Sequence, residues 1–166
     1  MNKKEVFAKA ADFCKVNHVE SYPVNIISLC EAQGIKVFED ELPYGVSGFI
    51  IIQKEKIPRY GANHLIVVNS NDAATRRRFT IAHELAHYVL HRDPGQPLYA
   101  HRDAGQNGGI ETEANTFAGA VLMPEKAVRD AMSYKYRVSP VTIYIAQNFL
   151  VSEDAARVRL QQLGMI

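Results

Sequence analysis

The sequence has few of the features that mark a secreted, membrane-bound or highly charged protein. Its two cysteines, Cys14 and Cys30, are too few for a disulfide framework in 166 residues, and each lies in a segment with apolar periodicity. We therefore expect both to be buried free thiols in a reducing compartment. The opening residues MNKKEVFAKAADF lack the continuous apolar stretch of a signal peptide, and no apolar run approaches the roughly 20 residues that cross a bilayer. These absences predict a cytoplasmic protein that does not associate with membranes.

An excess of charge of either sign is also missing. The sequence has 19 basic and 18 acidic residues, so no overall field would draw the chain to nucleic acid or anionic lipid, and nucleic acid is not expected as a partner. The one dense basic run, Arg76-Arg77-Arg78, is expected to be solvated at the start of a helix, with phosphate binding as the less favoured alternative.

The order of apolar patterns predicts an α+β domain. Apolar residues recur at helical spacing around residues 6–14 and 26–30, and the β-branched runs VSGFIIIQ (46–53) and HLIVVN (64–69) are typical of strands. IKVFED, from residue 35, also looks extended, so we expect a small, mainly antiparallel sheet of about three strands. From Ala73 onward the pattern is helical almost to the end. Strands followed by helices in this way are typical of the α+β class.

One segment rich in glycine and proline interrupts the helical half. Residues 92–110, RDPGQPLYAHRDAGQNGGI, contain four glycines and two prolines, which disfavour a helix. We predict a loop, and a loop of this length inside a compact domain is usually functional or mobile.

The most informative stretch is the predicted helix over residues 76–91, which contains FTIAHELAHYVLH. Apolar residues cover most of its circumference, so the helix must be largely buried. Its polar exceptions fall along one face, at offsets of 0, 3, 4, 7 and 11: Thr80, His83, Glu84, His87 and His91. Because an unpaired buried polar group costs roughly 1–3 kcal/mol, this face needs a polar counterpart. A metal ion would satisfy two neutral imidazoles at once.

The motif His83-Glu84-Leu85-Ala86-His87 has the spacing that zinc peptidases use. Histidines at i and i+4 project from one helical face, close enough for both rings to reach one Zn²⁺ ion at about 2.0–2.1 Å. Glu84 points toward the same cleft but is offset from the ligands, so it can take a proton from metal-activated water and deliver it to the leaving amine of a peptide. Nitrogen and carboxylate donors favour zinc, although Mn²⁺ or Fe²⁺ could occupy the site in vitro.

A third ligand is predicted in a second helix over IETEANTFAGAVLMP (110–124). Glu111 and Asn115 share one helical face, so Glu111 can ligate while Asn115 orients a ligand histidine through a hydrogen bond. Glu113 is turned about 200° away from Glu111 and is the less favoured ligand. The small Ala118-Gly119-Ala120 patch would allow this helix to pack closely against the first.

Other polar residues have weaker claims to the site. His91 lies about 12 Å along the helix axis from His83, too far for both to hold one ion, so a cap or cleft-rim role is expected for it. His101 is a freer candidate ligand because it lies in the predicted loop. Four side chains could donate a hydrogen bond to the oxyanion of the transition state, and the sequence does not choose among them: Tyr99, His101, Tyr134 and Tyr136.

Taken together, these motifs resemble the ImmA/IrrE metallopeptidases. RRRFTIAHELAHYVLH and ETEANTFAGAVLMP are similar to the two signature helices of that family, and weaker likeness extends through PVNIISLCEAQGIKVFE upstream and IAQNFLVSEDAARVRLQQLGMI downstream. The resemblance implies a gluzincin-like zinc endopeptidase with a zincin-like helical core, in which His83, His87 and Glu111 bind the metal and Glu84 is the base. It also implies a protein substrate: a helix-turn-helix repressor or antitoxin-type regulator encoded nearby, whose cleavage controls mobile-element or stress genes.

The C-terminal part supports a competing interpretation. Residues 140–162 resemble a helix-turn-helix, with Ser152 as the N-cap, and four side chains of the second helix could face DNA: Arg157, Arg159, Gln161 and Gln162. Its acidic start and the near-neutral net charge oppose binding to phosphates. We therefore predict a catalytic domain over 1–134 and a helical segment over 135–166 that packs on it.

The alternative function is a non-catalytic regulator, or a toxin–antitoxin component, that binds a protein partner or DNA and has a structural or vestigial metal site. Glu84 favours the enzyme, because a structural zinc site is a closed ligand set that needs no base beside it. For the enzyme, a strand flanking the cleft, 46–53 or 64–69, could receive an extended substrate by β-addition.

Overall fold

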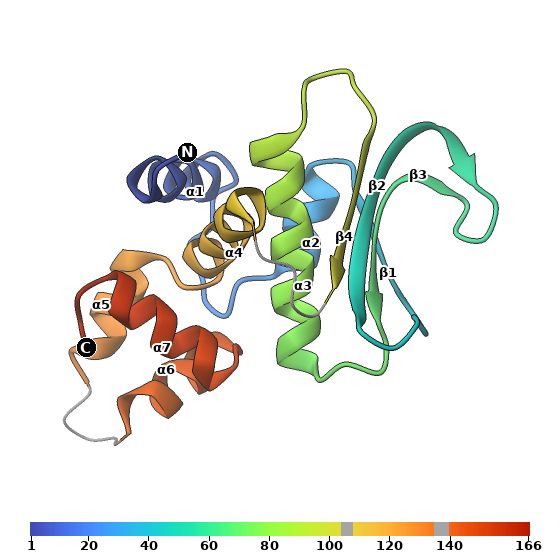
Figure 1. The fold of residues 1–166 in the computed structure, drawn as a ribbon. Coiled ribbons are helices and arrows are strands. Elements are labelled where there is room, and N and C mark those ends of the chain that lie inside the picture. The colour runs from blue at the N-terminus through green and yellow to red at the C-terminus, as the bar shows by residue number, and fades with distance from the viewer. Residues whose placement is uncertain (104–107, 135–139) are drawn as a thin grey trace.

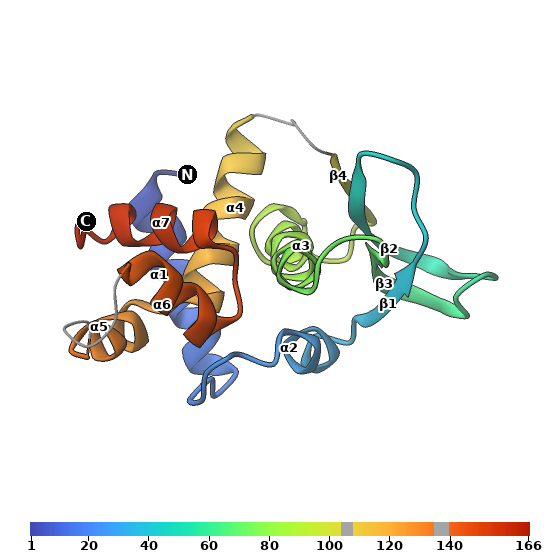
Figure 2. The same cartoon turned by 90° about the horizontal axis from the view of Figure 1, so that it is seen from below.

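The computed structural model describes residues 1–103, 108–134 and 140–166. In chain order its elements are α1 (Lys3–Val16), α2 (Ile26–Ala32), β1 (Lys36–Asp40), β2 (Val46–Ile57), β3 (Ala62–Asn69), α3 (Ala74–Ala86), the π-helical turn η1 (His87–His91), β4 (Leu98–Asp103), α4 (Gly109–Leu122), α5 (Glu125–Met132), α6 (Val141–Phe149) and α7 (Glu153–Gln162). Helix α3 stands between the sheet on one side and α1 and α4 to α7 on the other (Figures 1 and 2). The predicted α+β class is confirmed.

The sheet has four strands in the order β1-β3-β2-β4. β1 and β3 are parallel, whereas β2 is antiparallel to both β3 and β4, so the sheet is mainly antiparallel as predicted. The fourth strand lies inside the predicted loop over 92–110. Leu98–Asp103 pairs along β2, with Ala100 opposite Ile50, and the glycines and prolines of this segment flank the strand rather than interrupt it.

Alternation along β2 and β3 gives the sheet two apolar faces. Ile50, Ile52, Ile66 and Val68 belong to the large core that surrounds α3. Leu65 and Val67 point to the opposite face, where they form a small cluster with Ala62 that Phe38, Phe49 and Tyr60 cover. Each buried strand position therefore supports one of two layers, which fixes the register of the sheet relative to α3.

Gly48 allows α3 to pack closely against β2. A Cβ atom at this position would lie 2.6 Å from the carbonyl oxygen of Val67 and 2.7 Å from Cγ2 of Thr80. Any side chain here would push α3 away from the sheet, one turn before His83.

The basic run at the start of α3 connects the helix to its surroundings. Arg76 donates to Oγ of Ser47 at 2.7 Å, and Arg77 pairs with Glu39. Arg78 donates to the carbonyl oxygens of Val24 and Leu150. The run lies at the start of a helix and Arg76 is exposed, as expected. The expectation missed that its guanidinium groups also connect α3 to the sheet and to the C-terminal segment.

The helical half forms one core with α3. The rings of Phe13 on α1 and Phe117 on α4 lie 5.7 Å apart, and the same apolar cluster includes residues of α6 and α7, among them Ile145, Phe149 and Leu160. Cys14 and Cys30 also belong to this cluster and are free and buried, as predicted. The division at residue 134 stays a prediction, because residues 135–139 lie outside the described residues. The helices of the described segments include none that is long and apolar enough to cross a membrane.

Candidate metal centre

The polar face of α3 and η1 is buried, as its sequence predicted. Thr80, His83 and Glu84 on α3 and His87 on η1 have exposed fractions of 0–3%. Apolar neighbours such as Ile81 and Leu85 fill the core around the helix. The sequence therefore places four polar side chains where water does not reach them, which requires partners within the fold.

The partner on α4 is Glu111. One of its carboxylate oxygens lies 3.0 Å from Nε2 of His83 and the other lies 3.2 Å from Nε2 of His87. The two Nε2 atoms are 3.2 Å from each other. Each of the three predicted ligands thus brings one donor atom to the same point. They do so although Glu111 lies 24 positions after His87 in the sequence.

These distances fit a bound ion. Donor atoms held tetrahedrally at about 2.0–2.1 Å from one zinc ion lie about 3.3 Å from one another, close to the three separations of 3.0–3.2 Å. A cation between the two Nε2 atoms would accept the lone pairs of both neutral imidazoles at once. The set of two imidazoles and one carboxylate could therefore hold a metal ion, and it leaves a coordination position for water or substrate.

Each imidazole is held from behind through its other ring nitrogen. Nδ1 of His83 donates to Oδ1 of Asn115 on α4 at 2.9 Å, the hydrogen bond that the shared face of Glu111 and Asn115 predicted. Nδ1 of His87 lies 3.0 Å from Nδ1 of His91. Such contacts set the tautomer and the direction of the ring.

Burial lowers the pKa of His87 to about 4, and the neighbouring His91 adds to this effect. The ring is therefore neutral at pH 7, which is the form that binds a metal.

Glu113 has a different neighbour from Glu111. Its Oε2 lies 2.8 Å from Nε2 of His91, and its other oxygen contacts the amino group of Met1. These two contacts, that of the amino group first, lower the pKa of the Glu113 carboxyl. Among the described residues, Glu113 and His91 do not belong to the group that could hold a metal ion, but they stand directly behind it.

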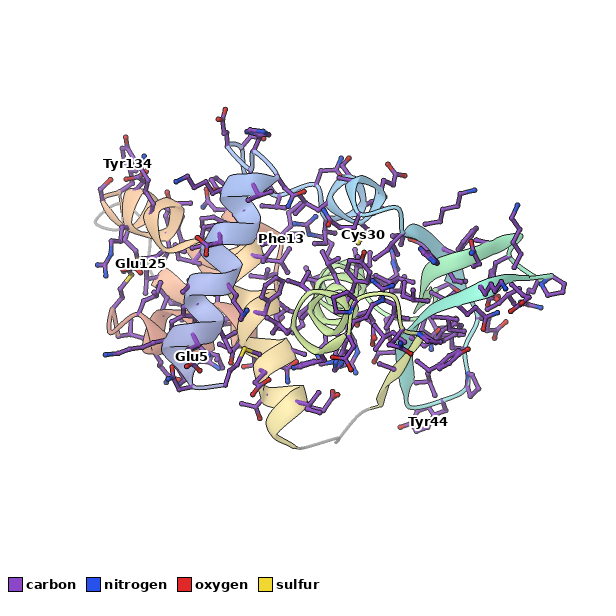
Figure 3. All side chains as sticks on the ribbon, turned by 90° about the horizontal axis from the view of Figure 1, so that it is seen from above. Glu5, Phe13, Cys30, Tyr44, Glu125 and Tyr134 are labelled. Atoms are coloured by element: carbon purple, nitrogen blue, oxygen red, sulfur yellow. The ribbon has the colours of Figure 1, made fainter. Side chains whose placement is uncertain are left out.

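The candidate oxyanion donors are not brought to the site as a group. The Tyr99 hydroxyl donates to Gln53 at 3.0 Å on the sheet. Tyr134 is exposed at the end of α5, on the far side of α1 and α4 from α3 (Figure 3). Tyr136 and the side chain of His101 lie outside the described residues, although the backbone of His101 pairs with Phe49.

The two arginines proposed to face DNA are engaged in other contacts. Arg159 is 4% exposed and donates to the carbonyl oxygen of Met123 at 2.9 Å. Arg157 pairs with Glu153 and Asp154. A helix that buries one of its two arginines and neutralises the other lacks the free cations that a DNA-reading helix needs.

A profile of the IrrE N-terminal-like domain, the peptidase M78 family, matches residues 30–161. The chain is 28% identical over 133 residues to an uncharacterized immunity region protein of Bacillus phage phi105, covering 73% of this chain and 83% of that one. It is 24% identical over 140 residues to the metallopeptidase ImmA of Bacillus subtilis, covering 84% and 77%. It is also 31% identical over 99 residues to the radiation response metalloprotease IrrE of Deinococcus deserti, covering 55% and 35%.

The fold is similar to that of a solved Mycobacterium tuberculosis transcriptional regulator, with a TM-score of 0.63 and 19% identity. That match covers 95% of this chain but 46% of the other, so the chain spans about half the length of that structure.

Proposed function

Because this chain belongs to the IrrE N-terminal-like peptidase family, we propose that it is a zinc-dependent endopeptidase of the cytoplasm that cleaves a protein regulator. His83, His87 and Glu111 are the proposed metal ligands and Glu84 the proposed catalytic base. The observation that carries the proposal is the convergence of two Nε2 atoms and one carboxylate at separations of 3.0–3.2 Å. Zinc is the metal that these donors favour, and Mn²⁺ could replace it.

When bound, the ion would act as a Lewis acid toward the scissile carbonyl and the attacking water. Glu84 would accept a proton from that water and pass it to the amine that leaves. Its position next to His83 and its complete burial suit this role, because a carboxylate in a water-poor site transfers protons without competition from bulk solvent. Asn115 would keep the lone pair of His83 directed at the ion through the hydrogen bond at Nδ1.

The sheet suggests how an extended substrate would bind. β3 lies between β1 and β2, and β2 lies between β3 and β4 over residues 46–52, so over these residues neither strand has a free edge for a further strand. β4 is an outer strand of the sheet and pairs only with β2 among the described residues. We propose that a locally unfolded segment of the substrate adds to β4.

The proposed substrate is a helix-turn-helix repressor encoded near this chain, whose cleavage would release mobile-element or stress genes. The relatives support this proposal, since one is named for a phage immunity region and another as a metallopeptidase.

The experiment combines the purified chain with the helix-turn-helix protein of a neighbouring reading frame, in the presence of Zn²⁺ or Mn²⁺. Fragments identified by mass spectrometry are expected with the wild type. Glu84→Gln should slow cleavage by about 10²–10⁴-fold, the usual contribution of a general base, while its metal content by elemental analysis stays unchanged. Glu31→Gln, at an exposed position on α2, is the matched control and should cleave normally. Undiminished cleavage by the Glu84 variant would overturn the assignment of the base.

A further inference from the structure

Behind the candidate ligand His87 lies a chain of hydrogen bonds that ends on a carboxylate. His87 and His91 face each other through their Nδ1 atoms at 3.0 Å, and the far nitrogen of His91, Nε2, lies 2.8 Å from Oε2 of Glu113. His91 and Glu113 are largely buried, with side chains 12% and 17% exposed. Both therefore keep their partners with little competition from water.

The partners in this chain fix the position of each proton. A carboxylate only accepts hydrogen bonds, so Nε2 of a neutral His91 must carry the proton and its Nδ1 must carry the lone pair. That lone pair can accept only if Nδ1 of His87 carries a proton. The lone pair of His87 is then left on Nε2, the atom that faces His83 and Glu111 at 3.2 Å from each.

We propose that His91 and Glu113 are positioning residues that hold His87 in its metal-binding tautomer. The inference rests on the proposed function only in taking His87 as a metal ligand. If the proton of His87 were on Nε2 instead, that nitrogen would offer no lone pair to an ion. His91 and Glu113 prevent this state, because it would set two lone pairs against each other between the rings of His87 and His91.

The local backbone provides the geometry for this contact. Residues 87–91 form a π-helical turn, a distortion that is frequent at functional sites. Within this turn the two rings lie 5.1 Å apart between centroids, with their planes inclined by 49°. The nitrogen atoms can therefore approach in the direction of a hydrogen bond rather than stack face to face.

The first turns of α4 serve both imidazoles. Asn115 accepts from Nδ1 of His83 directly, whereas Glu113 acts on His87 through His91. Glu111, the third residue of this helix at the site, faces the Nε2 atoms of both His83 and His87. One helix thus supplies a proposed ligand, the partner of His83, and the carboxylate that acts on His87 through His91.

The test measures zinc affinity by competition with a chromophoric chelator and does not depend on proteolysis. His91→Leu removes the acceptor for Nδ1 of His87 and should weaken zinc binding by about 10–100-fold, the usual effect of losing such a partner. His91→Asn places an amide oxygen near the position of the lost Nδ1 and should restore affinity to within about threefold of the wild type. His64→Leu, on β3, is the control for loss of a histidine elsewhere and should bind zinc normally.

The second measurement reads the tautomers directly. Nitrogen-15 NMR of the histidine side chains in the zinc-loaded protein should place the proton of His91 on Nε2 and that of His87 on Nδ1. The Nδ1 proton of His87 should persist in His91→Asn. If His91 carried its proton on Nδ1, or if folded His91→Leu bound zinc as tightly as the wild type, the inference would be overturned. Absence of zinc binding by the wild type would instead overturn the proposed function.

Discussion

Glu84 on α3 and the two glutamates Glu111 and Glu113 on the neighbouring helix α4 each have a different environment. Glu84 is completely buried on α3, Glu111 faces the Nε2 atoms of His83 and His87, and Glu113 faces His91. Glu111 and Glu113 point in different directions because they are two positions apart on a helix. The same separation that disfavoured Glu113 as a ligand places it on the flank of the site, where His91 meets it.

At the residue scale the two thiols provide a direct test of burial. Burial raises the pKa of Cys14 to about 11 and that of Cys30 to about 12. Because the thiolate is the species that reacts, only about one thiol in a thousand is ionised at pH 8 for a pKa of 11. We expect iodoacetamide to leave both cysteines of the native protein unmodified at pH 8 and to alkylate both in urea, as measured by intact mass. A thiol that reacts equally fast in the two states would show that its segment is not buried.

At the scale of elements, the helices and strands whose own residues show a full helical or β-strand pattern were predictable from the sequence. β2 and β3 carry β-branched runs, and α3 and α4 carry apolar residues at helical spacing, so local sequence alone indicates them. β4 has no such pattern, since LYAHRD has a single β-sheet-favouring aromatic residue and lies between glycines and prolines. β4 forms because β2 pairs with it from Leu98 to Asp103. A pairing between segments far apart in the sequence leaves no local signal.

The candidate site was predictable to the same degree. The i,i+4 spacing indicated that His83 and His87 would meet, and the face that Glu111 shares with Asn115 indicated Glu111 as their partner. The structure brings the three together, although metal binding itself stays a prediction. The contact of His91 with His87 was not predictable, because the spacing over residues 76–91 predicts a regular helix and the π-helical turn His87–His91 has no side-chain signature. In the Ala118-Gly119-Ala120 patch the glycine itself makes no close contact. A Cβ atom at Gly119 would meet nothing within 4 Å, so close packing of α4 on α3 does not need this glycine.

The contact between α3 and β2 leads to a prediction about Gly48. Gly48→Ala should lower the free energy of unfolding by about 1–3 kcal/mol, the usual cost of overpacking. Its Cβ would lie 2.7 Å from Cγ2 of Thr80 on α3 and 2.6 Å from the backbone oxygen of Val67 on β3. Gly119→Ala is the matched control. Its Cβ enters open space within a helix, so it should raise stability by roughly 0.5–1 kcal/mol. Urea titrations of both variants measure the difference, and equal effects of the two substitutions would contradict the close approach of α3 to β2.

At the scale of the whole molecule, α3 and α4 connect the sheet to the helical half. The proposed ligands come from α3, η1 and α4. Arg159 on α7 donates a hydrogen bond to Met123 at the end of α4. Its guanidinium also lies 4.8 Å from the ring centroid of Phe7 on α1, so this one side chain contacts both α4 and α1. An ion that joins α3 to α4 therefore joins two parts that share one apolar core.

Zinc should consequently stabilise the whole chain in a single unfolding transition. An ion that binds only the folded state adds about 4.1 kcal/mol at a free concentration 1,000 times its Kd. For a chain of this size each kcal/mol raises Tm by about 2–4 °C, so calorimetry should show a rise of roughly 8–16 °C that EDTA reverses. Glu111→Ala removes a proposed ligand and should lose most of this rise, whereas Glu31→Ala, at an exposed position on α2, should keep it. An equal rise in both variants would mean that the ion binds somewhere other than between α3 and α4, since only there does Glu111 contribute a donor atom.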